Sequence, residues 1–244
     1  DKTEANFVPL TPLSHLQRAA RVFPTRIAVV YNNHRVNYAE YYSRCSQLAS
    51  ALVAVGVKPG CVVATILPNV PAQAEAHFGV PACGAVLNTI NTRLDVDTVS
   101  YIFGHGEAKV VLVDSQFLAL AESACAQLGD KAPLIIEVSD SSAGFESSGK
   151  YKSYEQFLSS GDKKFKWLMP EDEWESLALN YTSGTTGRPK GVVYHHRGAY
   201  LMTMGTVVSW RMQIFPVFLT IVPLFHCNGC LLYTSPSPRD ATLS

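Results

Sequence analysis

The sequence predicts an α/β protein in which helices alternate with the strands of largely parallel sheets. Two observations carry this prediction: several strand-length apolar runs have no polar face, and segments with helical spacing lie between them. A strand that is apolar on both faces is typical of a parallel sheet covered by helices on each side. The 244 residues are 47% hydrophobic and 16% charged, which excludes a disordered chain and gives enough length for one large domain or two small ones.

The chain is predicted to begin with a helix, a hairpin and a second helix. Apolar residues recur with helical spacing over 12–23. The pattern over 27–38 is strand, turn, strand, with asparagines at its centre that tolerate the positive φ of a tight turn. An amphipathic helix is predicted over 38–55, and Gly56 follows it at the position where helices commonly end.

Beyond this helix, apolar runs and helical patterns alternate along the chain. The predicted strands are 61–67, 109–113 and 133–138, and the predicted helices are 71–79, 96–104, 116–128 and 153–158. A polar stretch over 139–149 is predicted to be a surface loop. The apolar run 212–225 is only 14 residues long and contains two prolines, whereas a membrane-spanning helix needs about 20 residues, so we predict a buried strand there.

Charge and cysteine content restrict the partners of the chain. Lysine plus arginine is 20 and aspartate plus glutamate is 20, so the formal net charge is zero and no basic excess favours nucleic acid or an anionic membrane. No secretory signal is apparent at the start of the sequence. Most of the six cysteines lie in or beside apolar runs, as free thiols in a reducing compartment do. Cys227 and Cys230 have redox spacing without a thioredoxin-like context.

The segment with the clearest chemical signal joins two predicted strands, 176–181 and 192–194. Its sequence is Thr182-Ser183-Gly184-Thr185-Thr186-Gly187-Arg188-Pro189-Lys190-Gly191. Hydroxyls and glycine N–H groups are hydrogen-bond donors, and lysine adds a positive charge, so the loop is a candidate phosphate cradle. A Walker A loop has glycine before the lysine and Ser or Thr after it, which this sequence lacks, so a P-loop kinase or NTPase is disfavoured. The alternative is a flexible surface hairpin.

This loop resembles the signature of the adenylate-forming enzymes, which include acyl-CoA synthetases, 4-coumarate–CoA ligases, luciferases and the adenylation domains of peptide synthetases. The resemblance covers about residues 6–230 and is strongest to the plant and bacterial acyl-activating enzymes. The segments that support this subgroup are 6–12, 68–71, 77–81, 87–94, 194–200 and 223–229. The fold that the resemblance implies is the first part of the large N-terminal domain of such an enzyme.

The resemblance also implies a reaction and its participants. A carboxylic acid and ATP would give an acyl-adenylate and pyrophosphate, and coenzyme A would then take the acyl group, with Mg²⁺ required. The residues that would hold the β- and γ-phosphates are Thr182, Ser183, Gly184, Thr185, Thr186, Gly187 and Lys190. Lys190 and His226 are the candidate catalytic residues, and His226 would position the acid carboxylate; the alternative is a structural histidine at a strand end. We expect His195 and His196 to be structural.

The resemblance divides the chain into a partial AMP-binding domain over 1–230 and a tail over 231–244. The tail has no periodicity and resembles the translated read-through of a sequencing adapter, although a genuine disordered tail is the alternative. Family members are about twice as long, so we expect this part alone to be inactive. A naturally truncated module that binds nucleotide or a partner is the competing hypothesis. The expected location is intracellular, either cytoplasmic or peroxisomal, with small-molecule partners and neither nucleic acid nor a transmembrane segment.

Overall fold

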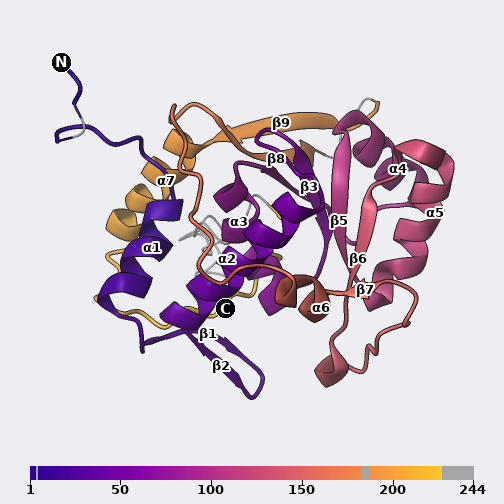
Figure 1. The fold of residues 1–244 in the computed structure, drawn as a ribbon, viewed down its shortest axis with the longest axis horizontal. Helices are drawn as coiled ribbons and strands as arrows, with labels where there is room; N and C mark the ends of the chain where they lie inside the picture. Colours follow the sequence, from indigo (N-terminus) through magenta and orange to yellow (C-terminus); the bar gives the residue numbers. More distant parts are fainter. Residues whose placement is uncertain (4, 183–186, 227–244) are drawn as a thin grey trace, which may run out of the picture.

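The computed structural model describes residues 1–3, 5–182 and 187–226, and its main feature is a helix-covered sheet (Figure 1). The strand order in this sheet is β7-β6-β5-β3-β4-β8-β9, and β1 and β2 form a separate hairpin. Neighbouring strands of the main sheet are parallel except β8 and β9, which are antiparallel. The predicted α/β class with a largely parallel sheet is therefore confirmed.

The elements alternate along the chain as the sequence predicts over most of its length. The helices are α1 Leu13–Val22, α2 Tyr38–Ala54, α3 Pro71–Gly79, α4 Val96–His105, α5 Leu118–Leu128, α6 Tyr154–Ser159 and α7 His196–Ser209. The strands are β1 Ile27–Tyr31, β2 His34–Asn37, β3 Val62–Ile66, β4 Val86–Thr89, β5 Ala108–Asp114, β6 Leu134–Val138, β7 Lys152–Ser153, β8 Ser176–Thr182 and β9 Lys190–His195. Within the described part of the chain, no helix combines the length and apolarity needed to cross a membrane.

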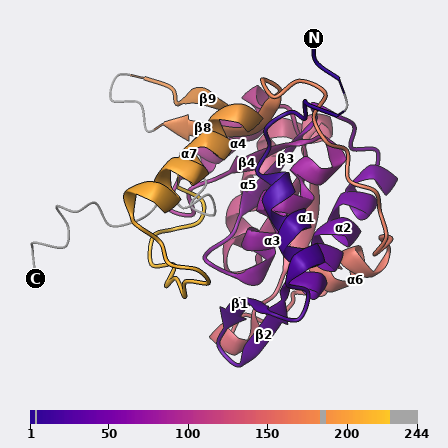
Figure 2. The same ribbon diagram turned by 90° about the vertical axis from the view of Figure 1, so that its left-hand side faces the viewer.

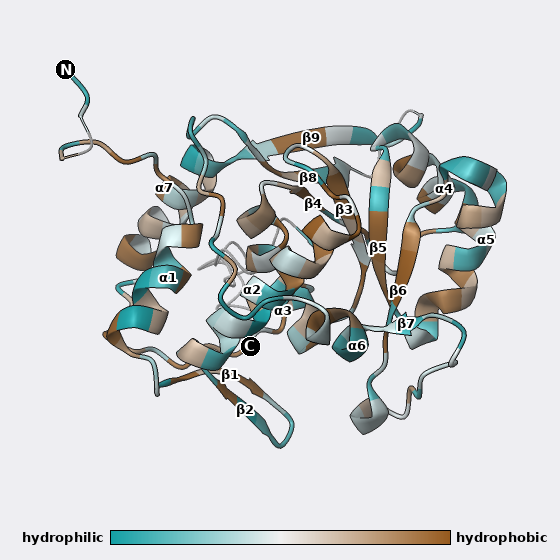
Figure 3. Ribbon diagram, in the orientation of Figure 1, coloured by the Kyte–Doolittle hydropathy of each residue, from teal (hydrophilic) through white to brown (hydrophobic). Residues whose placement is uncertain are grey.

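The central strands are buried on both faces, and this explains why their sequences are apolar runs. On β3, Val63 joins one hydrophobic cluster with Leu48 of α2, while Ala64 joins a second cluster with Phe103 of α4. Successive strand residues point to opposite faces, so both faces need a helical cover. Helices α2 and α3 lie on one side of the sheet and α4 and α5 on the other (Figure 1), with apolar strands between them (Figure 3).

Side-chain caps fix where several helices begin. The Asn37 side chain accepts a hydrogen bond from the Glu40 backbone N–H at 2.8 Å, and Asp95 accepts one from the Thr98 N–H at 2.9 Å. Ser153 begins α6 with a reciprocal capping box. Each cap satisfies a backbone donor that has no partner within its helix. Because β3 and β4 are parallel, the β3–α3 and β4–α4 connections start at the same edge of the sheet.

The predicted buried strand over 212–225 is wrong. This segment forms no strand, and its side chains are mostly exposed, with Ile214 at 86% and Val217 at 102% relative exposure. Pro216 and Pro223 cannot donate to a strand ladder, and Phe215 has a φ of 59°, which turns the chain away from an extended path. The segment instead follows α7 as a chain without helix or strand and runs below that helix (Figure 2).

A central strand and the last helix of the described chain were not predicted. Strand β4, Val86–Thr89, is buried throughout, and α7, His196–Ser209, extends the chain after β9. The Tyr200 ring of α7 stacks on the His15 ring of α1, with ring centroids 4.7 Å apart, and so connects α7 to the first helix. Cys45, Cys61, Cys83 and Cys125 are free thiols, as predicted; Cys227, Cys230 and the tail 231–244 lie outside the described residues.

Candidate functional site

The site lies at the carboxyl edge of the parallel strands β3 and β4. Asn69 follows β3, and Thr89 is the last residue of β4. The two strands are paired in parallel, with Val62 opposite Val86. In open α/β sheets, ligands bind in the crevice outside the carboxyl ends of the strands, where each strand leads into the next helix. This edge is therefore the first place to expect a ligand.

The antiparallel hairpin of β8 and β9 carries the predicted phosphate loop to this edge. Thr182 and Lys190 are register partners, so the two ends of the loop lie directly opposite each other. Gly187 has a φ of 148°, in the region that favours glycine, and a Cβ there would meet open space. Ser183, Gly184, Thr185 and Thr186 of the predicted loop lie outside the described residues.

Helix α4 contacts both ends of the loop. The Tyr181 hydroxyl, next to Thr182, lies 2.7 Å from His105 Nδ1 at the end of α4. Burial raises the pKa of Tyr181, and the nearby Tyr101 adds to the shift, so the phenol stays protonated. On the other side of the loop, the Arg188 guanidinium lies over the Tyr101 ring at 5.4 Å. These contacts fix the base of the loop against a rigid element.

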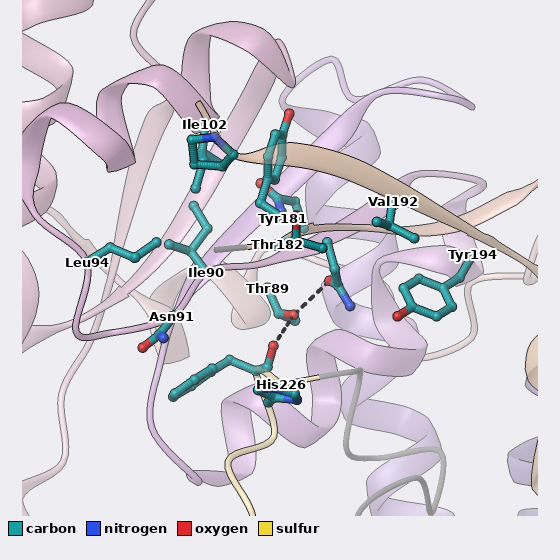
Figure 4. Close-up of a pocket in the computed structure, with 14 residues that line it drawn as sticks. Thr89, Ile90, Asn91, Leu94, Ile102, Tyr181, Thr182, Val192, Tyr194 and His226 are labelled. Atoms are coloured by element: carbon teal, nitrogen blue, oxygen red, sulfur yellow. Dashed lines mark hydrogen bonds between the residues drawn. The ribbon is translucent and has the colours of Figure 1, made fainter. Parts of the chain in front are cut away.

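A cavity of about 290 Å³ opens between the hairpin and the segment that ends at His226 (Figure 4). Thr182 and Tyr181 lie on one side of it and His226 on the other, with Thr89 between them. The cavity is lined by Asn88, Thr89, Ile90, Asn91, Leu94, Ile102, Asn180, Tyr181, Thr182, Pro189, Val192, Tyr194, Phe225 and His226. Amides and hydroxyls beside apolar side chains suit a ligand with both a polar and an apolar part.

The predicted site residues are only partly brought together. Thr182 and His226 both line the cavity, although they are 44 residues apart in sequence. Lys190 is exposed and is not among the described residues that line the cavity, although its neighbour Pro189 is. Lys190 lies at the loop end directly opposite Thr182.

Sequence reasoning missed the polar residues behind His226. Thr89 Oγ1 lies 2.7 Å from the Phe225 carbonyl oxygen and 3.1 Å from Asn180 Oδ1. The Asn69 side chain hydrogen-bonds to the backbone of Val222 and Leu224. A polar residue at the end of an apolar strand was the available signal, because such residues gather at the carboxyl edge of a parallel sheet.

His195 and His196 both have structural partners, as predicted. His195 accepts a hydrogen bond from the Gly198 backbone N–H at 2.8 Å and so caps α7. His196 is buried, and its Nδ1 lies 2.8 Å from Thr11 Oγ1. Burial lowers the pKa of His196 to about 4, so its ring is neutral at pH 7.

The described residues do not by themselves form a magnesium site. No carboxylate is among the described residues that line the cavity, and no group of three or more His, Cys, Asp or Glu residues that could hold a metal occurs among them. Magnesium prefers carboxylate and phosphate oxygens. The implied Mg²⁺ therefore lacks its protein ligands in this part of the chain, and none of the steps below depends on it.

The fold and the site together define the class of the adenylate-forming enzymes. A putative long-chain-fatty-acid CoA ligase from Rhodopseudomonas palustris superposes with a TM-score of 0.77 at 25% identity, over 92% of this chain and 54% of that one. An anthranilate CoA ligase in complex with anthranoyl-AMP superposes with a TM-score of 0.75 at 24% identity, over 85% of this chain and 39% of that one.

The chain belongs to the AMP-binding enzyme family, whose model matches residues 16–237. The peroxisomal acetate/butyrate–CoA ligase of Arabidopsis thaliana is 46% identical over 239 residues, which are 93% of this chain and 42% of that protein. An acetate–CoA ligase of Humulus lupulus is 45% identical over 240 residues, 93% of this chain and 42% of that protein. The chain thus spans less than half the length of these relatives.

Proposed function

We propose that this chain is the N-terminal part of an ATP-dependent carboxylic acid–CoA ligase. The observation that carries the proposal is the placement of Thr182 and His226 on opposite sides of one cavity at the carboxyl edge of the sheet. Relatives named as acetate– and butyrate–CoA ligases support the reaction class. The acid is left open, because the relatives also include proteins named for cinnamate and benzoate.

In the proposed first step, a carboxylate oxygen of the acid attacks the α-phosphorus of ATP. The bond between that phosphorus and the bridging oxygen to the β-phosphate breaks, and pyrophosphate leaves with the bonding electrons. Residues 182–187 would surround the β- and γ-phosphates with hydroxyl and backbone donors, and Lys190 would add a positive charge as negative charge builds on the leaving group. Such donors, fixed before the reaction, stabilise developing charge at little reorganisation cost.

His226 would act on the other side of the cavity, at the acid. A ring N–H would donate a hydrogen bond to the carboxylate and hold it in line with the α-phosphorus. Correct placement of two reactants lowers the barrier because it removes their translational and rotational freedom before the reaction. In the second step, the thiol of coenzyme A attacks the acyl carbon, AMP leaves, and the thiol proton passes to solvent.

We further propose that residues 1–244 alone do not complete this reaction. The chain spans 42% of the length of its ligase relatives, and its described part lacks a magnesium site. A protein that binds nucleotide without turnover is the competing function. We also propose a peroxisomal or cytoplasmic location, because the relatives include ligases named as peroxisomal; imaging of a tagged protein tests it.

The test is a pair of assays with the same acids, ATP and coenzyme A. Purified residues 1–244 are expected to form no acyl-CoA from short-chain, medium-chain or aromatic acids. A hybrid ligase, in which residues 1–226 replace the aligned segment of the Arabidopsis acetate/butyrate–CoA ligase, is expected to form acyl-CoA. A folded hybrid without any acid-dependent use of ATP would contradict the ligase assignment, and turnover by residues 1–244 would contradict the proposed incompleteness.

A further inference from the structure

We propose that Asn69 and Thr89 are positioning residues that hold segment 220–226 on the carboxyl edge of the sheet and thereby set the place of His226. The inference rests on the proposed role of His226 at the acid carboxylate. Asn69 lies three residues after the apolar strand β3, and Thr89 is the last residue of β4. The proposed roles of the loop and of His226 do not by themselves explain why these two positions are polar.

Asn69 binds the backbone of this segment as a neighbouring strand would. Its Nδ2 donates to the carbonyl oxygens of Thr220 and Val222, at 3.3 and 3.0 Å. Its Oδ1 accepts from the Leu224 backbone N–H at 2.7 Å. One side-chain amide thus uses both donor hydrogens and its acceptor on alternate residues of a chain that forms no strand. Asparagine supplies here the hydrogen bonds that a ladder would otherwise supply.

Thr89 joins the end of the same segment to the hairpin that carries the phosphate loop. Its hydroxyl lies 2.7 Å from the Phe225 carbonyl oxygen and 3.1 Å from Asn180 Oδ1. Dashed lines mark the two hydrogen bonds of Thr89 in Figure 4. The hydroxyl has one proton, so it donates to the nearer oxygen, that of Phe225. Phe225 directly precedes His226, and Asn180 lies two residues before Thr182. A single hydroxyl therefore lies between the two halves of the site.

The segment enters the fold at Leu224 and at the residues next to Thr89. Thr89 is 5% exposed and Leu224 is 8% exposed, whereas Leu219 and Ile221 are 77% and 79% exposed. Leu219 and Ile221 thus face solvent, whereas the segment is covered where Asn69 and Thr89 bind its backbone; the buried His77 ring also interacts with the Leu224 backbone. A hydrogen bond in such a buried place is strengthened by the low local dielectric, and its loss leaves a carbonyl without a partner.

The neighbouring strand offers a matched control. Thr65 of β3 is the register partner of Thr89, and it is fully buried. Its hydroxyl has no hydrogen-bond partner within the part of the chain that the structure describes. Thr65→Val and Thr89→Val therefore make the same side-chain replacement at paired positions of neighbouring strands. Only Thr89→Val removes a hydrogen bond to segment 220–226.

The first experiment measures backbone hydrogen exchange by mass spectrometry in residues 1–244, without any assumption about catalysis. Loss of about one net hydrogen bond is expected to raise the exchange rate of segment 220–226 about tenfold in Thr89→Val, and at least as much in Asn69→Ala. Thr65→Val and Thr89→Ser are expected to exchange like the wild type. Peptides from β5 serve as the internal reference for global unfolding.

Unchanged exchange of segment 220–226 in Thr89→Val, or an equal rise in Thr65→Val, would overturn the proposal. If Asn69→Ala also speeds exchange in β5, that variant has lost its fold and Thr89→Val alone decides. The second experiment uses the hybrid ligase: Thr89→Val is expected to raise KM for the acid about tenfold with KM for ATP unchanged, and Thr89→Ser to restore it.

An equal rise in both KM values would refute a role at the acid. A hybrid without ligase activity would refute the proposed function instead, while the exchange experiment would still decide whether Asn69 and Thr89 hold the segment.

Discussion

Two buried histidines make the stability of this fold depend on pH in a direction that the structure determines. His77 and His196 are 7% and 5% exposed, and burial lowers the pKa of each from 6.5 to about 4. For His77 the reason is visible: the Gln73 carbonyl accepts from Nδ1 at 2.7 Å, which leaves the proton-accepting nitrogen as Nε2. That Nε2 is buried, so a second proton there would add a charge in a low-dielectric place, and this cost exceeds what the backbone of Gln73 and Leu224 returns to the charged ring.

The sign and the size follow from proton linkage. Between pH 6.5 and 4 the unfolded state binds a proton at each histidine and the folded state does not, so stability falls as the pH falls through this window. For a pKa of about 4 in the folded state and 6.5 in the unfolded state, the shift from pH 7.5 to pH 5.0 costs about 2 kcal/mol per histidine. The two together account for about 4 kcal/mol.

The assay is urea unfolding of the wild type, His77→Gln and His196→Gln at pH 7.5 and 5.0, followed by circular dichroism. Each variant is expected to lose about 2 kcal/mol less than the wild type between the two pH values, whatever its stability at pH 7.5. His34→Gln, at an exposed position in β2, is the control and should follow the wild type. Variants that lose as much stability as the wild type would refute the linkage to these two rings.

Three further changes test packing and the site. The Glu75 carboxylate is 2% exposed and lies 2.5 Å from the Arg44 guanidinium, which Arg44→Met removes. Urea unfolding should then show a loss of about 3–5 kcal/mol in the free energy of unfolding. A loss below about 1 kcal/mol would contradict this reasoning. A Cβ on Gly161 would lie 2.1 Å from a backbone carbonyl oxygen, whereas one on Gly205 in α7 would meet open space. Gly161→Ala should therefore lower the melting temperature, and Gly205→Ala should raise the free energy of unfolding by about 0.5–1 kcal/mol. Equal effects of the two changes would contradict this prediction. In the hybrid ligase, His226→Ala should raise KM for the acid about tenfold, and a change in KM for ATP alone would exclude the acid side as its place.

The sequence was sufficient for three central strands of the sheet because these strands are buried on both faces. The runs that became β3, β5 and β6 are apolar at nearly every position, and helical spacing between them left few alternatives. Helix α7 lacked such a signal: Leu201, Met204 and Val208 are exposed apolar residues on it, so its sequence shows no clear division into apolar and polar faces. Composition alone also could not separate a buried strand from the exposed apolar return over 212–225.

The site was predictable at one of its ends only. The loop that begins at Thr182 carries its signal in ten consecutive residues, so the sequence alone identifies it. The contacts behind His226 come from residues 136 to 155 positions away, such as Thr89 with Phe225 and Asn69 with Leu224. Their partners are backbone atoms, which every residue has, so no pattern in the sequence marks the pairing.

The most direct test of the ligase assignment is acid-dependent exchange of labelled pyrophosphate into ATP by the hybrid ligase. This exchange reports formation of the acyl-adenylate without coenzyme A. We expect exchange with short-chain acids, and a fall of more than about tenfold in Lys190→Met, because a charge-assisted bond to phosphate is lost. Lys109→Met, at an exposed position in β5, should exchange like the unmodified hybrid. Exchange that persists unchanged in Lys190→Met, or that is absent from a folded hybrid, would contradict the assignment.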